Sequence, residues 1–213
     1  MKTIRNLYKI GLGPSSSHTM GPEKASKRFL ASCPDADSYR AILYGSLAET
    51  GKGHQTDVAI LDTLGRDKCE IVFNVDRTLE LPHENTLDLF AYDENGTETA
   101  KMRVMSVGGG DIRIEGVSAY DSPEIYEHSS YTEIAEYCKN RNMRLSDYVF
   151  EHEDEGFKTF LLDVWRTMQN AIREGLTHTG ELPGGLGVNR KAQRLYNQRH
   201  IDETPQTREN RLV

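Results

Sequence analysis

Hydrophobic positions along this chain follow two different periods, which predicts that strands and helices are interspersed. Short apolar runs bounded by glycine, proline or acidic residues predict strands. In Leu87, Leu89 and Ala91 the apolar positions alternate, as in a strand with one buried face, and residues 93–96 form a hairpin-turn sequence. The predicted strands cover residues 6–11, 39–47, 70–75, 87–92, 97–107 and 112–117.

Helical spacing appears in four other segments. One helix follows the loop at residues 13–18 and has Pro22 in its first turn; a second follows residue 54 and ends at Gly65. A third begins near Tyr131. The clearest covers residues 153–174, and because its apolar stripe has helical period we expect that stripe to pack in the core; it consists of Phe157, Leu161, Trp165, Met168 and Ile172. The apolar face predicted for the second helix is Val58, Leu61 and Leu64.

The order of these elements shows one repeated unit and two candidate segments of the chain. A strand, loop and helix occur twice before a series of strands joined by short turns. We expect a domain over residues 1–186, ending after the linker sequence 182–185, and a basic segment over residues 187–213. That segment has few apolar anchors, so we expect it to be mobile or held by a neighbour.

Composition restricts the function. The 213 residues carry a net charge of -7, which disfavours a general nucleic-acid binder, and no apolar stretch is long enough to span a membrane. No secretory signal precedes the first strand, so we expect a cytoplasmic protein. Cys33, Cys69 and Cys138 lack the spacing of metal ligands, which predicts reduced thiols and no metal site in this chain.

The first candidate site is the segment Gly11–Pro22, which contains three consecutive serines. Hydroxyl and N–H groups at a helix start can bind a carboxylate or phosphate. His18 follows them and can move a proton near neutral pH. By composition alone, a turn that only caps a helix is the more frequent outcome for such a sequence.

The second candidate site is the turn Gly51–Asp57, where His54 lies at or just before a helix start and Asp57 is near enough to orient it. A helix start favours the neutral, basic form of histidine. A lone histidine there is more often a surface cap. The turn lacks the remaining residues of a phosphate-binding Walker loop, which argues against ATP.

Taken together, these motifs resemble the N-terminal β domain of the iron–sulfur-dependent L-serine dehydratases. The resemblance rests on the order of five motifs over nearly the whole chain: Tyr8–Pro22, Gly51–Asp57, Pro82–Thr86, Ser106–Gly110, and Leu182–Gly185 followed by Asn189–Ala192. One departure is Gln55, where many relatives have glycine. The resemblance implies an α+β fold, a mixed sheet with helices packed on it, like the allosteric substrate-binding domain of phosphoglycerate dehydrogenases.

The resemblance also implies a function, deamination of L-serine to pyruvate and ammonia. In that family a [4Fe-4S] cluster acts as a Lewis acid. Its cysteines lie in a catalytic α domain, which follows in the same chain or is a separate subunit. We expect this chain to be the β domain alone, inactive and without a cluster by itself. Ser15, Ser16, Ser17 and Thr19 would bind substrate, and His18 and His54 would be the acid and base, in an order the sequence leaves open.

Two hypotheses follow. In the first, the chain joins a catalytic α domain, takes L-serine as substrate and forms a homodimer. In the second, it is a free-standing regulatory module that binds a small amino acid or hydroxy acid.

Overall fold

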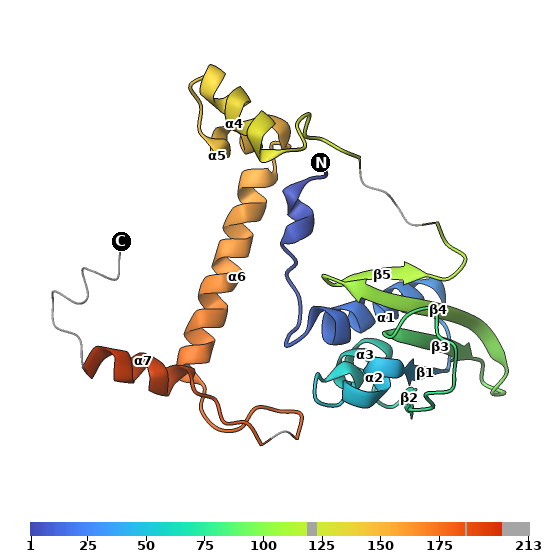
Figure 1. Cartoon of the computed structure of the whole chain (residues 1–213). Coiled ribbons are helices and arrows are strands. Elements are labelled where there is room, and N and C mark those ends of the chain that lie inside the picture. The colour runs from blue at the N-terminus through green and yellow to red at the C-terminus, as the bar shows by residue number, and fades with distance from the viewer. Residues whose placement is uncertain (119–122, 186, 202–213) are drawn as a thin grey trace. The chain divides into compact units, whose positions relative to one another are not determined.

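The computed structural model describes residues 1–118, 123–185 and 187–201, with side chains described through residue 198 (Figure 1). The chain divides into two units, Met1–Lys158 and Thr159–Val213, each described here by itself. Within the described residues, no helix has both the length and the apolar character needed to cross a membrane. The predicted boundary near residue 186 stays a prediction, and residues 202–213 of the predicted basic segment lie outside the described residues.

The first unit contains a five-stranded mixed sheet, which confirms the predicted α+β class. The strand order is β2-β1-β3-β4-β5, with β1 and β2 parallel and every other neighbouring pair antiparallel. A parallel pair needs a long crossover connection, and two helices between β1 and β2 supply it. The strands are β1 Ser38–Tyr44, β2 Cys69–Asn74, β3 Thr86–Tyr92, β4 Glu98–Gly108 and β5 Asp111–Ile114.

Three helices cover one face of this sheet: α1 Gly21–Ser32, α2 Gly45–Thr50 and α3 Thr56–Leu64 (Figure 1). Alternate residues of the strands point to that face, so their apolar side chains meet those of the helices in one core. Fully buried members include Leu43, Leu87, Leu89 and Val104 from the strands, and Ala25, Leu47 and Ile60 from the helices.

Several predicted boundaries are wrong. Residues 6–11 do not form a strand: a 3₁₀ turn occupies Ile4–Leu7, and Ile10 is exposed with no neighbouring strand to pair with. The strand expected over 39–47 stops at Tyr44, because Gly45 takes a positive φ and begins α2. Helix α3 buries Ala59, Ile60 and Leu64 rather than the predicted face of Val58, Leu61 and Leu64, of which Leu64 alone is buried.

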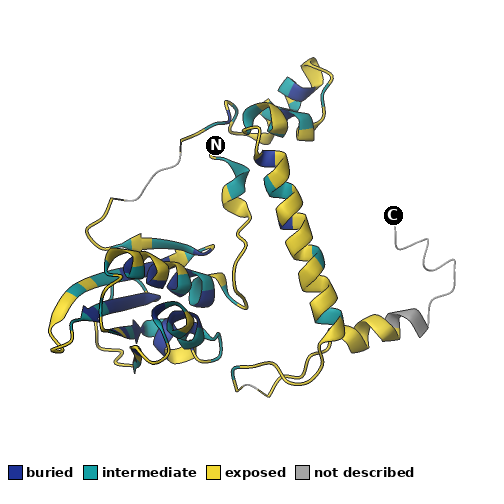
Figure 2. Cartoon of the chain, turned by 180° about the vertical axis from the view of Figure 1, so that it is seen from behind, coloured by how far each residue is buried: buried dark blue, intermediate teal, exposed yellow. Residues whose placement is uncertain are grey.

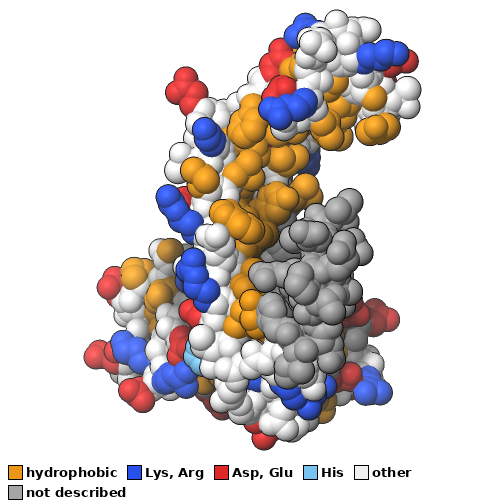
Figure 3. Space-filling view, turned by 90° about the vertical axis from the view of Figure 1, so that its left-hand side faces the viewer, with side chains coloured by type: hydrophobic (Ala, Val, Ile, Leu, Met, Phe, Trp, Pro, Cys, Tyr) orange, Lys and Arg blue, Asp and Glu red, His pale blue; other side chains and the backbone are white. Residues whose placement is uncertain are grey.

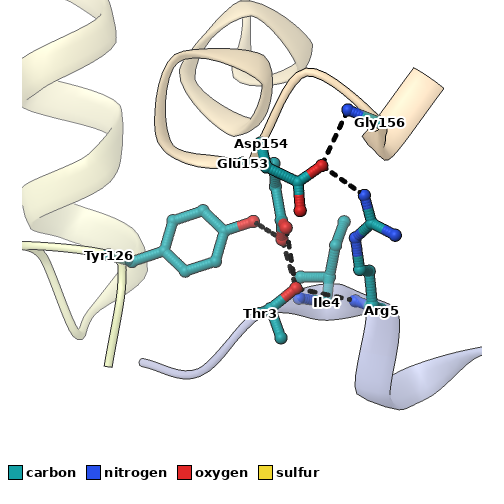
Figure 4. A network of polar contacts seen from close by, with 7 residues as sticks. All are labelled: Thr3, Ile4, Arg5, Tyr126, Glu153, Asp154 and Gly156. Atoms are coloured by element: carbon teal, nitrogen blue, oxygen red, sulfur yellow. Dashed lines mark hydrogen bonds and ion pairs between the residues drawn. The ribbon is translucent and has the colours of Figure 1, made fainter. Parts of the chain in front are cut away.

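The N-terminal segment joins a small helical module formed by α4 Tyr131–Asn140 and α5 Leu145–His152. The Glu153 carboxylate accepts hydrogen bonds from Thr3 Oγ1 (2.7 Å), Ile4 N (2.9 Å) and Tyr126 Oη (2.6 Å) (Figure 4). Arg5 pairs with Asp154 beside it. Glu153 therefore fastens residues far apart in sequence, and a separate aromatic cluster around Tyr126 and Tyr148 completes the module.

The second unit contains most of α6 Phe157–Thr177, together with α7 Ala192–Ile201. The helix predicted over 153–174 therefore starts later and continues past Gly175, and α7 was not predicted. The expectation that the α6 stripe packs in the core is wrong for three of its five residues. Phe157 is buried, but Trp165, Met168 and Ile172 are 53%, 45% and 57% exposed, and exposed residues predominate along the helix in Figure 2.

Candidate active site

The serine loop enters α1 through one π-helical turn, Ser16–Met20. Ser15 has an extended backbone, and its hydroxyl accepts a hydrogen bond from the N–H of His18 at 3.1 Å. This is the capping role that serine commonly plays at a helix start. Ser16 is exposed and Ser17 is half-buried, whereas Thr19 is fully buried. The loop therefore presents the side chains of Ser16 and Ser17 to solvent to different degrees, while Thr19 belongs to the interior.

The glycine turn holds His54 in place immediately before α3. Gly51 N donates to Leu47 O, and a Cβ at Gly51 would lie 2.2 Å from that same oxygen, so no larger residue fits. Gln55 adopts a left-handed backbone (φ 57°), which ends the turn and lets α3 begin at Thr56. The glycine expected in relatives would adopt that conformation more easily.

The structure brings the two predicted histidines together. Their ring centroids are 4.6 Å apart and the rings are tilted by 36°. Thr19 Oγ1 donates to the backbone oxygen of His54, and Thr56 Oγ1 donates to the backbone oxygen of His18. Both threonines are fully buried, so each loop fixes the backbone of the other loop's histidine. The expectation that His18 and His54 share one face and stay partly exposed is confirmed.

The hydrogen bonds of the rings indicate which nitrogens carry protons. His54 Nδ1 lies 3.0 Å from the backbone oxygen of Thr50. Because a carbonyl oxygen only accepts, Nδ1 must be the protonated nitrogen, and Nε2 of neutral His54 keeps its lone pair. His18 Nε2 lies 3.0 Å from Ser46 Oγ, a hydroxyl that can either donate or accept.

Burial lowers the pKa of His18 below its ordinary value, and the neighbouring charge of His54 lowers it further. A hydrogen bond at Ser46 and the carboxylate of Glu84 act in the opposite direction. At neutral pH His18 is therefore an uncharged imidazole. Two close imidazoles resist carrying two positive charges, which suits a pair that exchanges a single proton.

Ser46 is a site residue that the sequence reasoning missed, because it falls inside the strand predicted over 39–47. Gly45 before it has a φ of 51°, and a Cβ there would lie 2.4 Å from Glu84 O. Ser46 N donates to that same oxygen at 2.9 Å. The signal that could have revealed it is the glycine followed by serine where an apolar strand ends.

Two buried polar side-chain atoms lie near the start of α1, which follows the serine loop. Ser106 Oγ and Asn85 Oδ1 have no hydrogen-bond partner among the described residues. Ser106 packs against the first residue of α1, since a Cβ on Gly21 would come within 2.1 Å of its hydroxyl oxygen. Ser106 N bonds to Asn85 O, and Asn85 N bonds to His83 Nδ1. His83, to which the sequence analysis assigned no role, thus holds the backbone of Asn85, which in turn binds the backbone of Ser106.

The cysteines belong to three separate elements. Cys33 ends α1, Cys69 begins β2, and Cys138 lies in α4 within the other hydrophobic cluster. Burial raises the pKa of Cys69 to about 11, so its thiol is protonated at neutral pH. No group of three or more His, Cys, Asp or Glu side chains in the described chain could hold a metal ion. These residues do not fit an iron–sulfur cluster.

Comparison with known proteins adds to this geometry. Residues 3–72, which include both histidine loops and Ser46, match the family described as serine dehydratase beta chain. Over 92% of its length the chain is 31% identical to L-serine dehydratase of Haemophilus influenzae and 32% identical to L-serine dehydratase 1 of Escherichia coli, covering 54% of each. L-serine dehydratase of Streptomyces coelicolor is 29% identical over 96% of the chain and 56% of that protein. The chain spans about half the length of these relatives.

Proposed function

We propose that this chain is a serine dehydratase beta domain and that it supplies the proton-transfer residues of an L-serine dehydratase, which converts L-serine to pyruvate and ammonia. The observation that carries the proposal is the histidine pair, with rings 4.6 Å apart and backbones fixed by two buried threonines. The names of the relatives supply the substrate, L-serine.

The reaction needs one base and one acid. The Cα–H proton of serine goes to the base, its electron pair forms the Cα–Cβ double bond, and the β-hydroxyl leaves as water after gaining a proton. The resulting enamine isomerises to an imine, which water hydrolyses to pyruvate and ammonia. Histidines near neutral pH suit both proton transfers.

The tautomer of His54 supports one division of the roles. In it His54 is the base, because the bond from Nδ1 to Thr50 O leaves its Nε2 lone pair free to accept a proton. His18 is the proton carrier next to it, and Ser46 is a positioning residue that orients the His18 ring. The ring centroids lie 4.6 Å apart, so the proposal places the base beside the group that returns a proton toward the leaving hydroxyl.

The serine loop is the substrate-carboxylate site in this proposal. Ser16 and Ser17 are the partly accessible hydroxyls, and the N–H groups at the start of the helical turn add positive partial charge. Ser15 acts indirectly by capping the N–H of His18. Thr19 acts indirectly as well, because its buried hydroxyl already donates to His54 O, which revises the direct substrate contact expected for it.

The remaining half of the enzyme completes the site. We propose that a separate α part holds the [4Fe-4S] cluster, which supplies Lewis-acid chemistry when bound, since the described residues of this chain do not fit it. A cytoplasmic location and a homodimer are also part of this proposal. The three thiols, all free of disulfides, are consistent with a reducing compartment.

Reconstitution tests the proposal. The chain is mixed anaerobically with a cluster-loaded serine dehydratase α chain from the same organism, and pyruvate is measured. We expect serine-dependent pyruvate from the mixture and none from this chain alone. Serine binding by the chain without turnover in the mixture would instead support the regulatory module.

A further inference from the structure

The second unit has an amphipathic helix but no hydrophobic core of its own. Both hydrophobic clusters of the described chain take all their residues from Met1–Lys158. Among the described apolar residues of the second unit, Val164 alone is buried, and it keeps 7% of its surface exposed. A unit that buries so little apolar surface does not offset its loss of conformational entropy, so α6 needs a partner to be stable in this form.

The exposed residues of α6 lie close together. Trp165, Met168 and Ile172 follow one another at intervals of three and four, so they share one face of the helix, and Leu162 lies one turn before Trp165. All four side chains are exposed. In the space-filling view a band of hydrophobic side chains follows this helix (Figure 3). We call these four residues the α6 face.

We propose that the α6 face is the docking surface for the α part of the dehydratase, the portion of the relatives that lies outside the matched length. The relatives extend to nearly twice the matched length, as the chain covers 54% of each of the first two. A serine dehydratase therefore contains a second part of similar size. The inference rests on the proposed function for the identity of this partner.

The composition of the face agrees with a protein partner. Tryptophan, methionine and aromatic side chains are enriched in the buried centres of protein interfaces, where a tryptophan is often the residue that matters most. Trp165 lies in the middle of the face. Charged residues border this face, including Arg166, which lies one turn after Leu162 and pairs with Asp163 at 3.0 Å. The partner surface is thus an apolar groove or helix face with a polar border.

The chain contains a single tryptophan, so Trp165 can report on docking by itself. The chain is labelled with 5-fluorotryptophan and its one ¹⁹F resonance is followed in H₂O and D₂O during titration with the cluster-loaded α chain. We expect an exposed, isotope-sensitive signal in the free chain at every dilution, and a shifted signal that has lost its isotope sensitivity in the complex.

Variants locate the surface. The double change Met168→Ala and Ile172→Ala retains helix-forming residues, and we expect it to weaken docking by at least about ten-fold. Glu174→Ala lies on the opposite side of α6, nine residues after Trp165, and Val75→Ala changes an exposed apolar position in the first unit; both should leave the affinity within about two-fold. Circular dichroism of each variant confirms that helix content is retained.

The other outcomes contradict either the docking surface or the proposed function, and they can be told apart. Trp165 shielded in the free chain at the lowest concentration would show that the chain covers the face itself. Shielding that grows with concentration, together with a dimer in sedimentation, would assign the face to a second copy. Full binding by the double variant, with pyruvate formed, would refute the surface and leave the proposed function intact. Docking through the α6 face without formation of pyruvate would refute the proposed function and leave the docking surface intact.

Discussion

The β-sheet and helix α6 both carry a regular hydrophobic pattern, yet only the sheet buries its own. Leu87 and Leu89 of β3 are fully buried beneath α1–α3, whereas Trp165 and Ile172 of α6 are more than half exposed. A hydrophobic period therefore predicts an element and its apolar side, but it does not say which surface covers that side.

This difference separates two tasks within the chain. The first unit, Met1–Lys158, contains the sheet and is called the sheet unit below; its own core holds it together. That rigidity places His18, His54 and Ser46 at hydrogen-bonding distances from fixed partners. Helix α6 has no such core within its own unit, and the apolar side chains of the α6 face are exposed. Chemistry is thus assigned to the sheet unit and assembly to the helix, and the predictions below test that division.

The largest effect is expected at His54. Replacing a general base typically costs ~10²–10⁴ in rate, so His54→Ala in the reconstituted enzyme should lower kcat/KM by that order. The ¹⁹F signal of docking should not change. His178→Ala is the matched control, since His178 is an exposed histidine just past the end of α6. Equal losses in the two variants would contradict the assignment of chemistry to the sheet unit.

Equivalent truncations should have unequal effects on stability. Leu89→Ala removes buried methyl groups from a packed core and should lower the free energy of unfolding by about 2–5 kcal/mol. Ile172→Ala truncates an exposed side chain and should change it by less than about 0.5 kcal/mol in the isolated chain. Urea unfolding followed by circular dichroism measures both. A large loss for Ile172→Ala would mean that α6 is already packed.

The sequence predicted the sheet better than its surroundings, for physical reasons. Strands such as β2 and β3 have turn residues at both ends and a buried face, so their limits are local. The strand expected over 6–11 failed because an apolar run also needs a neighbouring strand, which no local pattern specifies. α7 escaped prediction because its described side chains are all exposed and show no apolar stripe.

The site was predictable in part. Loop composition identified His18 and His54 separately, and the resemblance placed them in one site, as the structure does. Their mutual locking could not be predicted, because the bonds from Thr19 and Thr56 cross 35 and 38 positions of sequence. Ser46 was hidden for a similar reason: its role depends on where β1 stops, which Gly45 decides by contact with Glu84.

A third, smaller effect should appear in the helical module, which depends on polar contacts more than the sheet does. Glu153→Gln removes the charge that receives three hydrogen bonds, and hydrogen bonds to charged groups are worth about 1.5–3 kcal/mol. Amide hydrogen exchange should become faster in α4 and α5, while that of β1 and β3 stays unchanged. Glu127→Gln, at the exposed residue next to Tyr126, is the control. Faster exchange throughout would show that the module and sheet unfold together.

The smallest effect concerns pH and belongs to the sheet unit alone. Burial and the charge of His54 lower the pKa of His18 below its ordinary 6.5. When pH falls below that value the unfolded chain binds a proton that the folded chain resists, so stability is lost as pH falls from about 6.5 through the lowered pKa. One proton limits the slope to ~1.4 kcal/mol per pH unit, and solvent screening at this half-exposed pair reduces it further.

Urea midpoints for the sheet, measured between pH 5 and 7.5 for the wild type and His18→Gln, should converge toward low pH, because the variant lacks the titrating imidazole. Parallel curves would show that neither burial nor the charge of His54 lowers the pKa of His18 in the folded chain, and would remove the argument that His18 is uncharged at neutral pH.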